Sequence, residues 1–172
     1  MPEPDGVLPN VYVQPGESHL VTEPSIMRTV LGSCVGIAFR IPRLGIGALC
    51  HPMLPSYPVK GAAKPTAAVG RRYVDFTIRD LAQQFDFLGA HRGEIEVKLF
   101  GGGDVLLVVS SASRPTVGKM NCDAAIKILR DEGFNVVASS LGGNRALTIQ
   151  FHTGTGEVLL KRLSVPGNPN TD

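Results

Sequence analysis

Eight short apolar segments, each bounded by Gly or Pro, constrain the fold of this 172-residue chain more than any other feature. They are rich in Val, Ile, Leu and Phe, which is typical of β-strands. The predicted strands are Val11–Val13, Met27–Leu31, Val35–Arg40, Leu44–Cys50, Ile95–Phe100, Phe134–Ser140, Arg145–Phe151 and Val158–Leu163. So many strands with few helices do not fit a doubly wound sheet, in which the two alternate. We therefore expect an α/β fold, a layered α/β sandwich with a mixed, largely antiparallel sheet.

Two segments carry the periodicity of helices, so the fold should have two main helices. In the first, apolar residues recur at steps of three and four over Val74–Leu88, and Gly89 stands where a C-cap belongs. In the second, Thr116 is placed to cap the N-terminus and Gly133 to end the helix. The residues expected on its buried face are Cys122, Ile126 and Leu129.

The composition is that of an ordinary globular domain, with 43% hydrophobic residues, 19% charged residues and a net charge of +2. Such a small net charge gives no indication of a nucleic-acid partner. We expect one domain over residues 1–172, with loose ends at 1–10 and 164–172 and a proline-rich surface loop over 52–65.

The first residues lack the basic start and apolar stretch of a signal peptide, and no apolar run approaches the ~20 residues that cross a bilayer. We therefore expect a cytoplasmic protein without membrane insertion, in which the three cysteines are reduced. The sequence has no CxxC pair and its four histidines are scattered, so no metal site is predicted. Cys50 and Cys122 are expected to pack in the core.

Gly32, Ser33 and Cys34 fall between two predicted strands. A small residue followed by Ser and Cys suits a tight turn that surrounds a thiol with backbone N–H groups. Such a turn can supply both the nucleophile and the oxyanion hole of acyl transfer. The alternative is that Cys34 is a small buried residue, which is common for free cysteine.

His51 stands where an apolar strand ends and the proline-rich loop begins. Polar residues at such positions often line clefts, although a histidine can also cap a strand end through a carbonyl. If Pro42 and Arg43 form the centre of a hairpin, Cys34 and His51 lie at equal distances from it. They would then be cross-strand neighbours within reach of proton transfer.

Lys98–Gly103 and Leu141–Gly143 are the two glycine-rich segments. Neither fits the GxGxxG or GxxxxGK[ST] pattern of a nucleotide site. We expect these glycines to allow tight turns or the close approach of another backbone. Phe100 precedes the first glycines and could be exposed for a partner, although a core position is the commoner outcome.

The order of these motifs resembles the CheD family of chemoreceptor glutamine deamidases. Residues 29–35, TVLGSCV, are similar to that family's nucleophile motif, and residues 47–55, GALCHPMLP, to its histidine motif. The similarity departs from the family at Cys50, where Asn is usual, and at Pro52, which is more often aromatic. The other similar segments are 73–75, 98–102, 117–121, 141–143 and 155–163.

The resemblance implies a catalytic set of Cys34, His51 and Thr29. It also implies a glutamine side chain of a methyl-accepting chemoreceptor as substrate and glutamate as product. No cofactor is needed. A CheC-type phosphatase is the further partner implied, with contact at Phe100, Gly101 and Gly102.

For the mechanism we expect an ion pair with protonated His51 to keep Cys34 as a thiolate, and the backbone N–H groups of Ser33 and Cys34 to hold the oxyanion. Two alternatives remain. One is a non-catalytic adaptor that binds receptors or a phosphatase. The other is a cysteine peptidase or esterase that uses the same dyad.

Overall fold

Two β-sheets and one helical layer make up the computed structural model, which describes residues 6–58, 63–105 and 114–164. The strands are β1 (Asn10–Tyr12), β2 (Ser18–Val21), β3 (Ile26–Leu31), β4 (Val35–Ile41), β5 (Ile46–Cys50), β6 (Glu96–Gly101), β7 (Asn135–Leu141), β8 (Leu147–His152) and β9 (Val158–Arg162). The α-helices are α1 (Ala67–Gly70), α2 (Val74–Phe87) and α3 (Val117–Asp131), and two 3₁₀ turns are η1 (Pro42–Leu44) and η2 (Arg92–Glu94).

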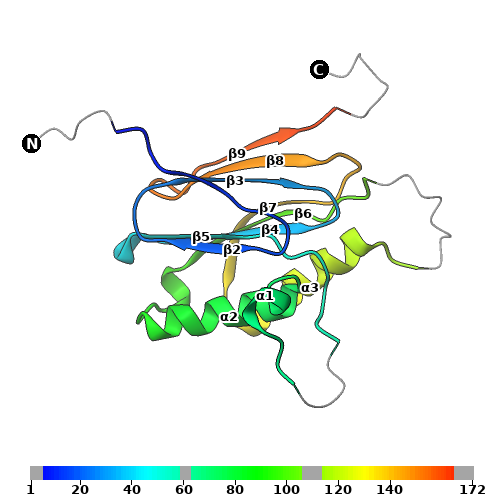
Figure 1. The fold of residues 1–172 in the computed structure, drawn as a ribbon, viewed down its shortest axis with the longest axis horizontal. Helices are drawn as coiled ribbons and strands as arrows, with labels where there is room; N and C mark the ends of the chain where they lie inside the picture. The colour runs from blue at the N-terminus through cyan, green and yellow to red at the C-terminus, as the bar shows by residue number, and fades with distance from the viewer. Residues whose placement is uncertain (1–5, 59–62, 106–113, 165–172) are drawn as a thin grey trace, which may run out of the picture.

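The layers follow from the strand order. One sheet has the order β1-β3-β8-β9 and the other β2-β5-β4-β6-β7. Figure 1 shows the second sheet between the first sheet and the helices. Only β1–β3 and β6–β7 are parallel pairs among the described strands, so the predicted mixed, largely antiparallel α/β architecture is confirmed. Its division into two sheets was not expected.

The middle sheet is buried on both faces, as its strand β4 illustrates. Ile37 and Phe39 belong to the core under the helices, whereas Ala38 belongs to the core between the sheets. The ring of Phe39 lies 5.4 Å from that of Phe85 on α2 and 5.4 Å from that of Phe134. Strands buried on both faces read as continuous apolar runs, which explains why β4 and β5 lack a polar alternation.

The helix signals are confirmed at both ends. Thr116 accepts a hydrogen bond from the backbone of Lys119, and Gly89 and Gly133 end their helices with positive φ values of 74° and 79°. One core assignment is wrong: Ile126 is 48% exposed. The buried stripe of α3 instead includes Gly118, Asn121, Cys122, Ala125, Ile128 and Leu129.

Besides the two 3₁₀ turns, one strand and one α-helix were not predicted. Strand β2 is half-buried along its length and pairs with the edge of β5, and α1 is a single turn. Neither offers the long apolar period on which sequence prediction depends. The predicted loose ends and loop fall partly on residues 1–5, 59–62 and 165–172, which lie outside the described part. Asn10, expected in the N-terminal end, already belongs to β1.

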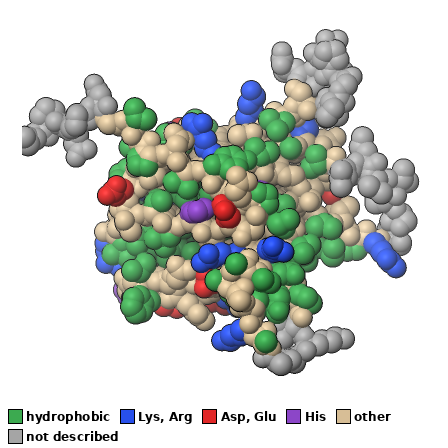
Figure 2. All heavy atoms as spheres, in the orientation of Figure 1, with side chains coloured by type: hydrophobic (Ala, Val, Ile, Leu, Met, Phe, Trp, Pro, Cys, Tyr) green, Lys and Arg blue, Asp and Glu red, His purple; other side chains and the backbone are tan. Residues whose placement is uncertain are grey.

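The visible surface mixes side chains of all kinds. Figure 2 shows basic, acidic and hydrophobic groups interspersed on the face viewed, without a patch of one charge sign there. Within residues 6–58, 63–105 and 114–164, no helix combines the length and apolarity required to cross a bilayer.

Candidate active site

The hairpin of β4 and β5 brings Cys34 and His51 to the same end of the middle sheet. Its pairing runs from Ile41 opposite Ile46 to Ile37 opposite Cys50. Continued by one residue, this register places Gly36 opposite His51. The predicted hairpin is therefore correct, but the predicted register of Cys34 opposite His51 is wrong by two residues. The reason is that η1 and Gly45, with φ 63°, form a longer connection than the two-residue turn assumed.

A shift of two residues leaves both side chains on the same face, because strand side chains alternate with period two. Cys34 packs against the core between the sheets, and so does Leu49, two residues before His51. Cys34 and His51 become diagonal neighbours, whose Cβ atoms in a regular sheet are separated by about 7 Å. Gly36 lies opposite His51, and the space above it is taken by the side chains of Leu31 and Ile149.

His51 is held from the other sheet. The hydroxyl Oγ1 of Thr29, on β3, lies 2.7 Å from Nδ1 of His51 and donates a hydrogen bond to the Val13 carbonyl at 2.7 Å. A hydroxyl has one proton. Since that proton is donated to Val13, Thr29 accepts from His51, and we assign the imidazole proton to Nδ1. This leaves the Nε2 lone pair free to act as a base.

Both members of the predicted dyad are uncharged at neutral pH. Burial is the main cause that lowers the pKa of His51 to about 4, and a hydrogen bond to the Val13 carbonyl acts in the opposite direction. Burial also raises the pKa of the Cys34 thiol, which its own backbone N–H only partly offsets. The expected thiolate–imidazolium pair is therefore not the resting state: burial keeps both the thiol and the imidazole neutral.

Access differs between the two groups. Cys34 is partly exposed, whereas His51 is only 2% exposed. No hydrogen bond joins Cys34 Sγ to the His51 ring within the described ranges, and catalytic hydrogen bonds often tighten only when substrate is bound. A substrate side chain can thus reach the thiol, whereas the imidazole is covered.

The glycine-rich segment after β6 supports the nucleophile turn. Gly102 N donates to the Cys34 carbonyl at 2.8 Å, and Gly103 N donates to the Gly32 carbonyl at 2.9 Å. Gly101 and Gly102 have φ values of 94° and 64°. A Cβ on Gly101 would come within 3.0 Å of the Cys34 carbonyl, and one on Gly102 within 3.0 Å of the Cys122 thiol. These contacts are the close approach of backbones predicted for the glycines.

Ser33 and Gly32 form the turn as expected, and over the described residues the backbone N–H groups of Ser33 and Cys34 donate to no other backbone group. Phe100 is 5% exposed and lies in the core between the sheets, and Gly101 and Gly102 are buried as well. The possibility that Phe100 is exposed for a partner is therefore wrong. A partner contact in this region stays a prediction.

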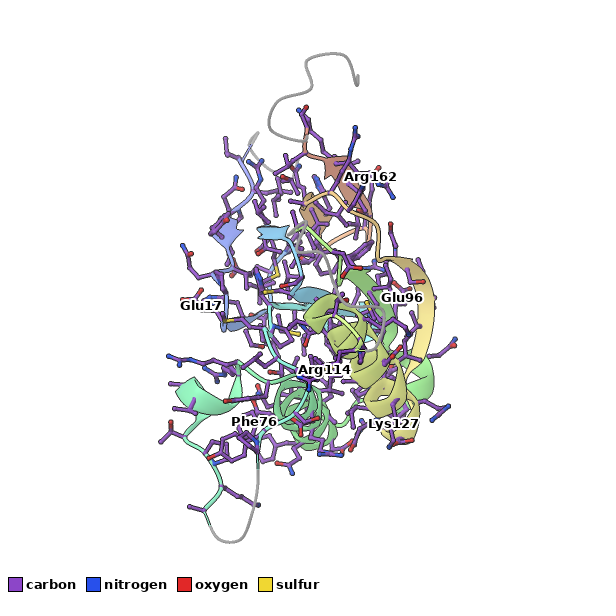
Figure 3. All side chains as sticks on the ribbon, turned by 90° about the vertical axis from the view of Figure 1, so that its right-hand side faces the viewer. Glu17, Phe76, Glu96, Arg114, Lys127 and Arg162 are labelled. Atoms are coloured by element: carbon purple, nitrogen blue, oxygen red, sulfur yellow. The ribbon has the colours of Figure 1, made fainter. Side chains whose placement is uncertain are left out.

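Asn121 is the site residue that sequence reasoning missed. It lies on α3, is 0% exposed, and its Nδ2 donates to the carbonyls of Ser33 and Met53, each at 2.9 Å. The available signal was its helical spacing with Ala125 and Ile128, which places an amide on the buried face. Figure 3 views the molecule from this end, with α3 in front below the two sheets.

The part of the chain that the structure describes holds no group of three or more His, Cys, Asp or Glu side chains arranged to bind a metal. Cys50 and Cys122 are buried on the helix side of the middle sheet, as predicted. Burial raises the pKa of both thiols. Of the three cysteines, Cys34 is the one that combines partial exposure with a neighbouring histidine.

Comparisons with known proteins place the chain in a family. The family model described as CheD chemotactic sensory transduction matches residues 53–162. A protein of Geobacter sulfurreducens named probable chemoreceptor glutamine deamidase CheD 2 is 42% identical over 91% of this chain and 92% of its own length. Another, from Maridesulfovibrio salexigens, is named probable chemoreceptor glutamine deamidase CheD and is 37% identical over 95% and 97%. Among solved structures, YlmD of Geobacillus stearothermophilus aligns with a TM-score of 0.48 and 13% identity, over 73% of this chain and half of that one.

Proposed function

This chain belongs to the CheD family and is a chemoreceptor glutamine deamidase, and from that premise we propose that it works through Cys34 as nucleophile and His51 as general base. The observation that carries the proposal is the hydrogen bond between Thr29 and His51, at 2.7 Å, which directs the basic nitrogen of His51 away from Thr29. This hydrogen bond lies at the same end of the middle sheet as Cys34, which is partly exposed.

Acylation begins from the neutral pair. His51 Nε2 takes the Cys34 proton as the sulfur attacks the amide carbon of the glutamine side chain, so the charge separation arises only during attack. The amide oxygen becomes an oxyanion that accepts hydrogen bonds from the backbone N–H groups of Ser33 and Cys34. Each such donor is typically worth about 3 kcal/mol.

Collapse of this intermediate breaks the carbon–nitrogen bond. His51 returns its proton to the leaving nitrogen, ammonia departs, and a thioester to Cys34 remains. His51 is again neutral and activates a water molecule that hydrolyses the thioester, which gives glutamate and restores the thiol. Thr29 keeps the imidazole in one tautomer and orientation through both steps, as the third member of catalytic sets does. This sequence requires no metal and no organic cofactor.

The substrate is a glutamine on the cytoplasmic helices of a methyl-accepting chemoreceptor, so the proposal includes action in the cytoplasm. A CheC-type phosphatase is a further partner of the proposal, supported by the resemblance over Lys98–Gly102. Because Phe100 and the glycines beside it are buried, such a contact would use their exposed neighbours Asp104 and Val105.

The test is mass spectrometry of a purified receptor cytoplasmic fragment after incubation with the wild-type protein, Cys34→Ala or Cys122→Ala. The proposal expects a gain of about one dalton at specific glutamines with the wild type and with Cys122→Ala, and none with Cys34→Ala. Binding of the fragment without any mass change would support the adaptor. Cleavage of the peptide chain or of receptor methyl esters would support the peptidase or esterase.

A further inference from the structure

We propose that Asn121 is a positioning residue that sets the separation of Cys34 and His51, an inference that rests on the proposed function of this pair. Asn121 comes from a different layer than either of them. Its two amide protons go to the carbonyl of Ser33, directly before Cys34, and to that of Met53, two residues after His51.

The need for such a link follows from the end of the hairpin. Ladder pairing between β4 and β5 stops at Ile37 and Cys50, so beyond this point the two strands no longer hold each other. The His51 segment is bound on its outer side, where His51 N donates to Glu17 O at 2.9 Å and Gly16 N donates to His51 O at 2.8 Å.

The Cys34 segment is bound on its opposite side, by Gly102 and Gly103. The two catalytic segments are therefore fixed to different neighbours. Among the described hydrogen bonds, the Asn121 amide is the group that joins them directly, with equal distances of 2.9 Å to each side. A change in this bridge would alter the spacing of the dyad without touching either catalytic side chain.

The chemistry of Asn121 fits this role better than simple packing. A primary amide offers two donors on one nitrogen, whereas a carboxylate of the same shape offers none. Its other atom, Oδ1, is buried and accepts no hydrogen bond from the described residues. Both partners of Nδ2 are carbonyl oxygens, which only accept, so the two donors of the amide are the groups that form the bridge.

Helix α3, which carries Asn121, is packed tightly against the glycine segment after β6. Helix α3 packs its Gly118 against the Gly102 and Gly103 backbone so closely that a Cβ there would come within 3.0 Å of both carbonyl oxygens. The same glycine segment holds the Cys34 turn, so α3 and the nucleophile share one support. Asn121 adds the His51 segment to that support.

The experiment compares Asn121→Leu and Asn121→Asp with Thr153→Val in the deamidation assay. Thr153 is a matched control because it is also buried, its hydroxyl accepts from Ser25 N at 2.9 Å, and it packs beside Gly47 at the far end of β5. We expect kcat/KM to fall about 100-fold in both Asn121 variants, mostly in kcat, since misplacement by about 1 Å has effects of this size. Thr153→Val should stay within about twofold of the wild type, because the residue is remote from the dyad.

Two readouts separate positioning from general destabilisation. The residual activity of Asn121→Leu should rise with pH as the thiol ionises without help, whereas the wild type should be nearly constant above pH 6. In a His51→Ala background, Asn121→Leu should have little further effect, because the alignment that it disturbs is no longer used. The Asn121→Asp variant, of the same shape, provides the test if Asn121→Leu does not fold.

The proposal is overturned if the Asn121 variants lose no more activity than Thr153→Val, or if Asn121→Leu has the same effect with and without His51. Failure of the proposed function looks different. In that case the wild-type protein itself would show no turnover that depends on Cys34.

Discussion

Thr29 lies on β3 of the outer sheet and His51 directly follows β5 of the middle sheet, yet Oγ1 of Thr29 is 2.7 Å from Nδ1 of His51. The single proton of this hydroxyl is donated to the Val13 carbonyl at 2.7 Å, so the contact selects one imidazole tautomer. A side chain from the outer sheet thus determines which nitrogen of His51 carries the proton and which keeps its lone pair. The first prediction follows from this pair.

Thr29→Val should lower kcat/KM by a factor on the order of 10², because the base loses its fixed orientation. It should also lower the unfolding free energy by about 1–3 kcal/mol, since the Val13 carbonyl loses one donor and the buried Nδ1–H of His51 loses its Thr29 acceptor. Thr29→Ser keeps the hydroxyl and is the control, with activity close to that of the wild type. Deamidation kinetics and urea unfolding measure both effects, and equal activity of the two variants would contradict the assignment.

The resting thiol leads to a second prediction, on alkylation. Because burial raises the pKa of Cys34, its reaction with iodoacetamide should be slow at pH 7 and should keep accelerating above pH 9. The rate can be followed by intact mass at several pH values, with Cys34→Ala as the blank. A rate that reaches its plateau below pH 7 would show a preformed thiolate and contradict the neutral pair.

The buried imidazole makes stability depend on pH. The folded pKa of His51 is lowered from 6.5 to about 4, so between these values the unfolded chain binds a proton that the folded chain does not. Neutral, buried His51 therefore contributes to the free energy of unfolding above pH 6.5. This contribution is lost as the pH falls toward 4, by at most about 3 kcal/mol.

Urea unfolding at pH 7 and pH 4.5 should therefore show a smaller loss of stability on acidification in His51→Gln than in the wild type. His91→Gln, at an exposed histidine, serves as the control and should keep the wild-type dependence. Parallel curves for all three proteins would mean that His51 is not the group responsible.

The glycine segment gives a fourth prediction. Gly102→Ala requires a positive φ of 64° and places a Cβ against the Cys122 thiol and the Gly118 carbonyl. Gly89→Ala also requires a positive φ, of 74°, but meets no atom within 4 Å. We expect Gly89→Ala to lower stability by about 1 kcal/mol and Gly102→Ala by clearly more, about 3 kcal/mol. Thermal unfolding compares them, and only Gly102→Ala should also reduce deamidation. Equal losses would mean that the backbone contact is not tight.

Local patterns were enough to find the hairpin, both main helices and the positions of Cys34 and His51 at the end of that hairpin, whereas their catalytic roles stay a prediction. Val35–Ile41 and Ile46–Cys50 are apolar runs with a proline between them, and that alone indicates adjacent strands. The register was out of reach, because it depends on Gly45 adopting a left-handed conformation after η1. The sequence prediction assumed a two-residue turn between the strands, whereas residues 42–45 form the connection between Ile41 and Ile46.

Contacts between layers were equally out of reach. Ile126 follows the helical period of α3 but points to solvent, while Asn121 occupies the face that packs on the sheet. From polarity alone, Ile126 would be expected on the buried face and Asn121 in solvent. Local hydrophobicity cannot indicate that two backbone carbonyls, from the Ser33 and Met53 positions, need donors at that point. Strand β2 was missed for a similar reason, since its partner β5 rather than its own pattern defines it.

The double burial of β4 has a consequence for how the protein loses its activity. This strand is paired on both edges and covered on both faces, so its amides should be the last to exchange with deuterated solvent, through global opening alone. Cys34 directly precedes it and His51 directly follows its partner strand β5. Fraying of the edge strand β9 or of the chain ends would leave these two anchors, and Thr29 on β3, intact. Heat should therefore abolish the activity of the dyad in the same cooperative transition that melts the fold.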